Sequence, residues 1–150
     1  MAEAYDLIVR GGIAVTPDGR AQADIGVRQG RIAAMGDLAR ASAPTIVEAQ
    51  HLHLIPGVID TQVHFREPGL EHKEDIATGT AGAVLGGVTA VFDMPNTNPS
   101  TTTAADLADK VARARGRARC DMAFFVGAAE HNMDRLGQLE RLPGAAGIKL

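Results

Sequence analysis

Several residue types are scarce in this chain of 150 residues. It has no tryptophan, one tyrosine and four phenylalanines, and Cys120 is its single cysteine. One cysteine excludes an internal disulfide and a metal site built from several thiolates. Because Cys120 opens an apolar run, we interpret it as a core thiol rather than a reactive one.

Long apolar runs are also missing. No stretch approaches the roughly 18 consecutive apolar residues that a membrane helix needs. The first residues, MAEAYDLIVRGG, lack the basic, apolar and small-residue order of a signal peptide. We therefore expect a cytoplasmic protein with no membrane partner.

The charge pattern argues against a nucleic-acid partner. The net charge is -3, and the chain has no basic stripe outside the cluster KVARARGRAR. In that cluster the apolar residues recur at helical spacing and the arginines fall largely elsewhere, which predicts an amphipathic helix with a charged, solvent-facing side. The apolar positions are Leu107, Val111 and Ala114, and the arginines are Arg113, Arg115 and Arg117.

The chain changes texture near residue 54. Residues 5–50 hold short apolar runs separated by Gly-Gly, Pro-Asp-Gly, Gln-Gly and Gly-Asp, which is typical of small antiparallel strands joined by tight turns. We therefore predict a small β module over residues 1–54.

From residue 55 onward, four apolar runs alternate with helical patterns: IPGVIDTQV, VTAVFDM, CDMAFFVGA and AGIKL. Their spacing is that of βαβ units, which predicts an α/β protein with a parallel sheet covered by helices. A closed (β/α)₈ TIM barrel needs eight strands and about 250 residues. We expect residues 55–150 to be the truncated first half of such a barrel, from a longer protein, with an open four-stranded sheet as the alternative.

Two longer helices are predicted between these strands. The first has an apolar face and ends at Gly86 or Gly87, and the second begins at a Thr cap, ends at Gly116 and carries an Asp106 to Lys110 pair at i,i+4 spacing. The apolar face of the first helix comprises Ile76, Ala77, Ala81, Val84 and Leu85.

Polar side chains gather where the predicted strands end. Functional residues of parallel α/β folds lie at the carboxyl ends of strands. Alternation places four polar residues of the first strand end on one face: Asp60, Gln62, His64 and Arg66. Two ligands two residues apart can hold one metal ion, and imidazole suits zinc, but the neutral amide of Gln62 is a poor zinc ligand.

The other histidines do not fit a metal site. His51 and His53 have His-x-His spacing but precede the first barrel strand, at the end away from the expected site. His72 falls in a charged helix start and His131 in a loop, and neither has a second ligand at metal spacing.

Lys149 lies in the run AAGIKL, which predicts a buried strand. An unpaired ammonium group is costly to bury, and burial lowers its pKa. In one interpretation the side chain reaches water. In the other, a neutral lysine beside a metal reacts with carbon dioxide to form a carbamate, whose two oxygens bridge two ions.

The segment PGVIDTQVHFREPGLEHKEDIATGTAGAVLGGVTAVFDMPNTNP resembles the dihydroorotases of the cyclic amidohydrolase superfamily. The most diagnostic parts are HFREPG followed by EHKED, and DMPNTNP, and the resemblance extends from the β module through GIKL. Hydantoinases share the Pro-Gly-x-Ile-Asp part, and allantoinases are closer but typically lack the Arg of HFREPG.

The resemblance implies roles for particular residues. His64 would be a zinc ligand, Arg66 and Asn96 would hold the substrate carboxylate, and Lys149 would be the candidate carbamate in a site with one or two zinc ions. Arg66 suits this role because a guanidinium binds a carboxylate through two parallel hydrogen bonds. Asp60 would be a further ligand or would orient one.

Gln62 departs from the family pattern, because it stands where dihydroorotases have the first His. The resemblance implies a metal-dependent hydrolase that interconverts dihydroorotate and N-carbamoyl-aspartate in pyrimidine biosynthesis. The remaining ligands and the catalytic Asp would lie beyond residue 150, so we expect the 150-residue piece to be inactive alone.

Two alternatives remain. The first is a non-catalytic, dihydroorotase-like scaffold subunit that partners aspartate carbamoyltransferase, which Gln62 also suits. The second is an allantoinase or another cyclic amidase. The expected partners are a small-molecule substrate and either a second copy of the chain in a homodimer or aspartate carbamoyltransferase.

Overall fold

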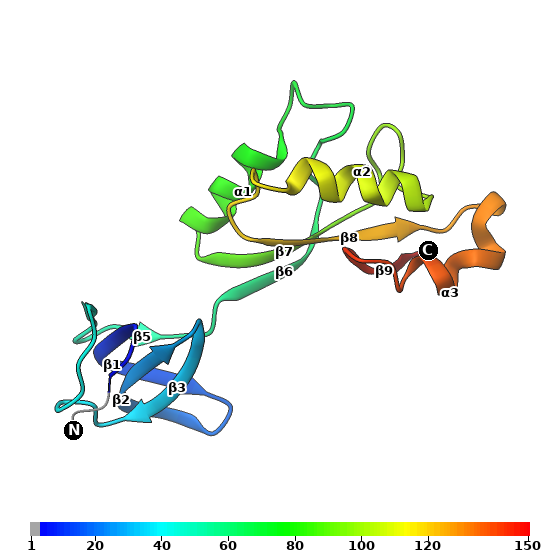
Figure 1. The fold of residues 1–150 in the computed structure, drawn as a ribbon. Coiled ribbons are helices and arrows are strands. Elements are labelled where there is room, and N and C mark those ends of the chain that lie inside the picture. The colour runs from blue at the N-terminus through cyan, green and yellow to red at the C-terminus, as the bar shows by residue number, and fades with distance from the viewer. Residues whose placement is uncertain (1–3) are drawn as a thin grey trace. The chain divides into compact units, whose positions relative to one another are not determined.

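The computed structural model describes residues 4–150. They divide into two compact units, one up to Pro56 and one from Gly57 onward. Figure 1 shows an open sheet in the first unit and a curled sheet with helices in the second.

The first unit is a small sheet. Strands β1 (Leu7–Thr16), β2 (Gly19–Arg28) and β3 (Arg31–Gly36) pair antiparallel, as the turn signals predicted. Strands β4 (Thr45–Glu48) and β5 (His53–Leu54) instead pair parallel with β1, which the sequence analysis did not predict. The reason is that residues 37–44 carry the chain back across the sheet after β3, and such crossovers produce parallel pairs.

The second unit contains four parallel strands in the order β6, β7, β8, β9. Their bounds are Val58–Val63, Val88–Asp93, Asp121–Gly127 and Ala145–Lys149. The connections contain α1 (Ile76–Leu85), α2 (Ala104–Ala114), and a 3₁₀ segment, η1 (Glu130–Arg135), followed by α3 (Leu136–Leu139). This confirms the predicted α/β class, with a curled parallel half-barrel after a β module.

The sheet of the second unit has two chemically different faces. Phe124 and Val126 of β8 are buried in a cluster with Leu107 of α2 and Leu139 of α3, so this face packs on the helices. By strand alternation the opposite face carries Phe92 and Phe125, whose rings meet edge to face at 6.3 Å. The helix-covered face therefore supplies the core of this unit.

Helix α2 begins as predicted but differs along its length. Thr103 is its N-cap and accepts a hydrogen bond from the Asp106 backbone N–H, and the Asp106 side chain returns to Thr103 in a capping box. The predicted Asp106 to Lys110 pair is wrong, because Asp106 is committed to the cap and Lys110 is buried against Asp93. The i,i+4 spacing favours a surface pair between Asp106 and Lys110, but Lys110 instead pairs with the buried carboxylate of Asp93.

The apolar face predicted for α1 is also partly wrong. Ile76 is buried, but Leu85 is 90% exposed, and the other buried positions are Gly79 and Thr80. A Cβ at position 79 would lie 2.7 Å from the Phe65 ring, so the helix packs through Gly79 as well as Ile76, and not through Leu85. The Thr80 hydroxyl is buried at no cost because it donates to the Ile76 carbonyl.

Cys120 directly precedes β8 and is half-buried. Burial and the neighbouring Asp121 carboxylate raise the pKa of its thiol, which keeps it protonated and unreactive. Among residues 4–150, none of the helices combines the length and apolar character that crossing a bilayer requires.

Candidate functional site

His64 and Asn96 lie together at the carboxyl ends of β6 and β7. The His64 Nδ1 atom is 2.9 Å from the Asn96 Oδ1 atom. A carbonyl oxygen only accepts hydrogen bonds, so the neutral tautomer that matches this contact carries its proton on Nδ1 and has a lone pair on Nε2. The amide NH₂ of Asn96 remains available as a donor. Metal-ligating histidines are generally oriented by an acceptor on their other nitrogen, and Asn96 Oδ1 is such an acceptor.

Asp93 holds these two strand ends in register. Its Oδ1 atom accepts the Phe65 backbone N–H at 2.9 Å, and its Oδ2 atom lies 2.8 Å from Lys110 Nζ. Lys110 also donates to the Met94 carbonyl at 3.1 Å. Because Phe65 follows His64 and Asp93 precedes Asn96 by three residues, these bonds place His64 beside Asn96.

The Asp93 to Lys110 pair is fully buried, with side-chain exposures of 0% and 1%. Burial raises the pKa of Asp93, and the attraction of Lys110 only partly opposes it. Burial likewise lowers the pKa of Lys110, against the pull of Asp93. Neither residue was assigned to the site from the sequence. The available signals were an Asp directly before the Met-Pro-Asn segment and a Lys on the apolar side of a helix.

Arg66 is half-buried, and its guanidinium has no hydrogen-bond or ion-pair partner within residues 4–150. Its backbone carbonyl accepts the Leu70 N–H at 2.9 Å, which closes a turn in the loop between β6 and α1. An unpaired, partly buried guanidinium near a strand end is a ready partner for an anion.

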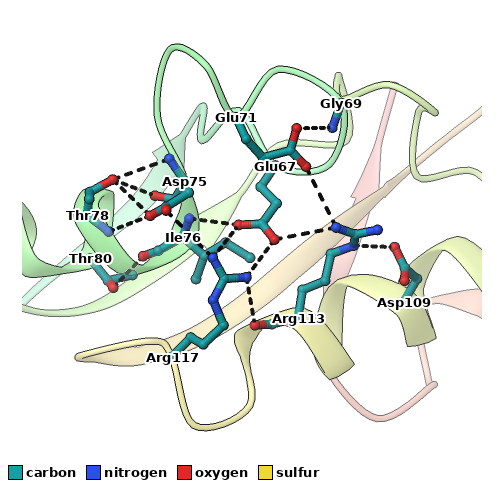
Figure 2. A network of polar contacts seen from close by, with 10 residues as sticks. All are labelled: Glu67, Gly69, Glu71, Asp75, Ile76, Thr78, Thr80, Asp109, Arg113 and Arg117. Carbon is teal, nitrogen blue, oxygen red and sulfur yellow. Dashed lines mark hydrogen bonds and ion pairs between the residues drawn. The ribbon is translucent and has the colours of Figure 1, made fainter.

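Glu67, the next residue, is the centre of a polar network that Figure 2 shows. Its side chain is buried and accepts two hydrogen bonds from Arg117, at 2.6 and 3.0 Å, and one from the Ile76 backbone N–H at 3.1 Å. Arg113 approaches the same carboxylate at 3.5 Å and pairs with Asp109 at 2.6 Å. Arg113 and Arg117 therefore do not simply face solvent, contrary to the prediction from helical spacing.

Asp60 and Gln62 are exposed. The Asp60 Oδ1 atom accepts the backbone N–H of Gln62 at 3.0 Å, at a point where the pairing of β6 with β7 is irregular. That bond occupies one carboxylate oxygen locally, in the manner of an Asx turn. The Gln62 side chain has no hydrogen-bond partner within the described residues.

Lys149 ends β9 and is exposed, whereas the sequence predicted a buried strand position. It aligns with Gly127 of β8, and its carbonyl accepts the Ala128 N–H at 2.8 Å. Strands β6 and β9 are the two edges of the four-stranded sheet. His64 and Lys149 therefore lie at the carboxyl ends of strands in the same sheet, but their strands are not neighbours. Within residues 4–150, no three His, Cys, Asp or Glu side chains converge on a point that could hold a metal.

The remaining histidines are divided between the two units. His53 belongs to β5 of the first unit, and His51 precedes it with a positive φ of 68°. His72 is exposed in the loop before α1, and His131 is exposed in η1.

Comparison with known proteins identifies relatives of this chain. A family model described as dihydro-orotase-like matches residues 52–142. An allantoinase of Desulfitobacterium hafniense is 38% identical over 146 residues, covering 97% of this chain and 32% of the relative. The multifunctional protein CAD of Squalus acanthias is 50% identical over 96 residues, covering 64% of this chain and 4% of that protein.

A solved structure of similar fold is an L-hydantoinase (dihydropyrimidinase) from Arthrobacter aurescens. It matches with a TM-score of 0.90 and 30% sequence identity, over 96% of this chain and 32% of that one. The chain thus spans about a third of the length of the allantoinases and hydantoinases that it matches.

Proposed function

The chain belongs to the dihydro-orotase-like family, and we propose that it forms the amino-terminal part of a hydrolase that interconverts L-dihydroorotate and N-carbamoyl-L-aspartate in pyrimidine biosynthesis. The observation that carries the proposal is the 2.9 Å contact between His64 and Asn96. It joins a nitrogen suited to a metal with an amide donor suited to a substrate, one loop residue away from the unpaired Arg66.

Among the described residues, His64 is the one whose side chain is well suited to bind zinc. His64 would hold the ion through Nε2, because its Nδ1–H is committed to Asn96. Asp60 fits less well, since one of its oxygens accepts the Gln62 N–H, and Gln62 itself is a poor zinc ligand. Lys149, as a carbamate, would be a further donor, and the other ligands and the catalytic Asp would come from residues beyond 150. When bound, zinc supplies a Lewis acid and an activated water.

The chain's own residues would bind and orient the substrate. Arg66 would take the substrate carboxylate through two parallel hydrogen bonds, and the Asn96 NH₂ would donate to the same group. Holding the carboxylate fixes the ring amide at the carboxyl ends of the strands, where water attacks its carbonyl carbon and the C–N bond breaks. The Asp expected beyond residue 150 would transfer the proton to the departing nitrogen.

Substrate assays of the complete protein test the proposal. We expect turnover of dihydroorotate and N-carbamoyl-aspartate, and a loss of roughly 10- to 100-fold in kcat/KM for both in Arg66→Met, because a hydrogen bond to a charged group contributes about 1.5–3 kcal/mol. His72→Ala, an exposed change in the same loop, is the matched control and should retain activity. No turnover of either compound would contradict the proposal.

A second candidate is an allantoinase or another cyclic amidase, favoured by the 38% identity to an allantoinase over nearly the whole chain. Allantoin and hydantoin lack the carboxylate that Arg66 would bind. Turnover of either compound, unaffected by Arg66→Met, would establish this candidate instead.

A third candidate is a non-catalytic scaffold subunit, which Gln62 motivates. It predicts that none of these substrates is turned over and that the protein co-purifies with aspartate carbamoyltransferase. Zinc titration of the complete protein against its His64→Ala variant separates the candidates further. A hydrolase should lose bound zinc with the imidazole, whereas a scaffold without a metal should show no difference.

A further inference from the structure

The loop between β6 and α1, residues 64–75, carries His64 and Arg66 at its start and is tied to helix α2 by Glu67. Burial alternates along this start: Phe65 and Glu67 are buried, while His64 is exposed and Arg66 is half-buried. Alternation of this kind sends successive side chains to opposite sides of an extended segment. The contacts of the buried residues Phe65 and Glu67 therefore determine the direction in which His64 and Arg66 point.

Glu67 is held more firmly than a surface carboxylate. Arg117 donates from both terminal nitrogens, one to each oxygen, and the Ile76 N–H adds a third bond from the first turn of α1. Burial opposes ionisation of Glu67, but these hydrogen bonds outweigh it and hold its pKa below the ordinary value. Glu67 thus joins the loop, the start of α1 and the turn after α2 through an ionised group.

The contacts around Arg117 and Arg113 close the arrangement. Arg117 also lies 3.7 Å from Asp75, the N-cap of α1, and Arg113 lies 3.7 Å from Glu71 in the loop. Arg113 belongs to the last turn of α2 and Arg117 to the turn that follows the helix, and Figure 2 shows their side chains on either side of the Glu67 carboxylate. The loop is therefore attached to the end of α2 and to the turn after it through charges at three of the loop's positions.

Arg66 has no comparable support. Its guanidinium makes no hydrogen bond or ion pair with the described residues, so its direction depends on the backbone that Glu67 fixes. We propose that Glu67, clamped by Arg117, is a positioning residue that aims Arg66 at the substrate carboxylate. This inference rests on the proposed function for its substrate and adds a residue that acts through Arg66.

Steady-state kinetics of the complete protein test the proposal. Glu67→Gln keeps the shape and an acceptor for the Ile76 N–H but removes the charge that Arg117 grips. We expect KM for N-carbamoyl-aspartate to rise about tenfold with kcat within about twofold, because a misdirected Arg66 weakens binding of the carboxylate more than it alters the chemistry. Arg117→Lys, which keeps the charge but loses the two-pronged geometry, should fall between wild type and Glu67→Gln.

A double-mutant cycle separates positioning from general stability. If Glu67 acts through Arg66, then Glu67→Gln in an Arg66→Met background should raise KM no further. An additional tenfold rise in that background would overturn the proposal. Asp109→Asn is the matched control, because it removes a bond to Arg113 on the same helix without touching Glu67, and it should leave KM unchanged.

Amide hydrogen exchange gives a readout that needs no substrate. Glu67→Gln should speed exchange at the Leu70 and Ile76 amides, whose hydrogen bonds depend on the loop, and leave the strand β8 amides unaffected. If no cyclic amide is turned over but this exchange changes, the proposed function fails while the clamp stands. Unchanged exchange together with unchanged KM would refute the clamp.

Discussion

Two ion pairs hold the segment that carries His64 and Arg66, and they differ in their access to water. The Asp93 to Lys110 pair lies behind Phe65, and both side chains are at most 1% exposed. The Glu67 to Arg117 pair, which we call the open pair, lies two residues further on, with Glu67 4% and Arg117 40% exposed. The first pair fixes this short stretch to α2 and the second fixes it to the turn after α2, but only the second can exchange its protein contacts for water.

The pKa values of the two carboxyl groups shift in opposite directions. Burial raises the pKa of Asp93 in spite of Lys110, whereas at Glu67 the hydrogen bonds from Arg117 and Ile76 overcome burial and lower the pKa. A buried pair is costly to form and very costly to break on one side, because the remaining charge is stranded. An open pair can be weakened gradually, which suits a contact that adjusts the position of a substrate-binding residue.

The largest effect is expected from breaking the buried pair on one side. Lys110→Met removes the counter-charge and leaves the Asp93 carboxylate buried among apolar neighbours. We expect a loss of about 3–5 kcal/mol in the free energy of unfolding, measured by denaturant titration of the complete protein.

The matched control changes both partners. In Asp93→Asn/Lys110→Met the amide oxygen still accepts the Phe65 N–H but no charge is stranded. This double variant should lose clearly less stability than Lys110→Met alone. A loss below about 1 kcal/mol for Lys110→Met would show that water reaches Asp93, and the contrast between the two pairs would disappear.

A smaller loss is expected at Gly69, two residues after the open pair. Gly69 has a φ of 94°, and a Cβ there would lie 2.1 Å from the Asn98 carbonyl oxygen. Gly69→Ala combines backbone strain of about 1–2 kcal/mol with a forced shift of the loop against Asn98. Thermal unfolding should show a clear fall in Tm.

Gly82→Ala is the control for this change. Gly82 lies inside α1, where an added Cβ meets nothing within 4 Å, so alanine should stabilise the protein by up to about 1 kcal/mol. If Gly69→Ala were equally harmless, the loop would not depend on close contact with the Asn98 backbone. The open pair would then be the main attachment of the loop.

The alternation of strands and helices was predictable because apolar runs and turn residues are local signals. The strand-end rule also placed His64 at the carboxyl end of its strand, and the resemblance added Asn96 as a second residue of the same site. The contact between these two side chains was not predicted, because it depends on Asp93 accepting the Phe65 N–H across 28 residues.

The supporting charges were not predictable from local pattern. Lys110 and Asp106 have the spacing of a surface pair, yet the capping box takes Asp106 and the buried Asp93 takes Lys110. Similarly, Arg117 meets Glu67 across 50 residues, and helical periodicity placed it on the solvent side. Periodicity identifies which face of a helix is polar, but not which distant carboxylate reaches that face.

The open pair should show its character in the pH dependence of stability. Because the folded pKa of Glu67 lies below the ordinary value of 4.5, its contribution is complete above that pH and is lost as the pH falls through the folded pKa. At pH 7, Glu67→Gln should cost about 1.5–3 kcal/mol, the range for hydrogen bonds to a charged group. The difference between the two proteins should shrink steadily in titrations from pH 5 to pH 3.

Glutamine does not titrate, so the variant itself is the reference for all other acidic groups. A difference that stayed constant down to pH 3 would mean that Glu67 acts by shape and not by charge. The contact would then resemble packing, and its proposed control of Arg66 would not depend on ionisation.

The smallest effect is expected at the outer edge of the open pair. Asp109 holds Arg113 at 2.6 Å, but it is 51% exposed and the pair has i,i+4 spacing on α2. Asp109→Asn should cost at most about 0.5 kcal/mol, and the cost should vanish in high salt, because exposed pairs are screened. A loss above about 1 kcal/mol that persisted in salt would mean that Arg113 must be held in place to support Glu67. The clamp would then extend to the surface of α2, and the distinction between a rigid buried pair and an adjustable open pair would be one of degree.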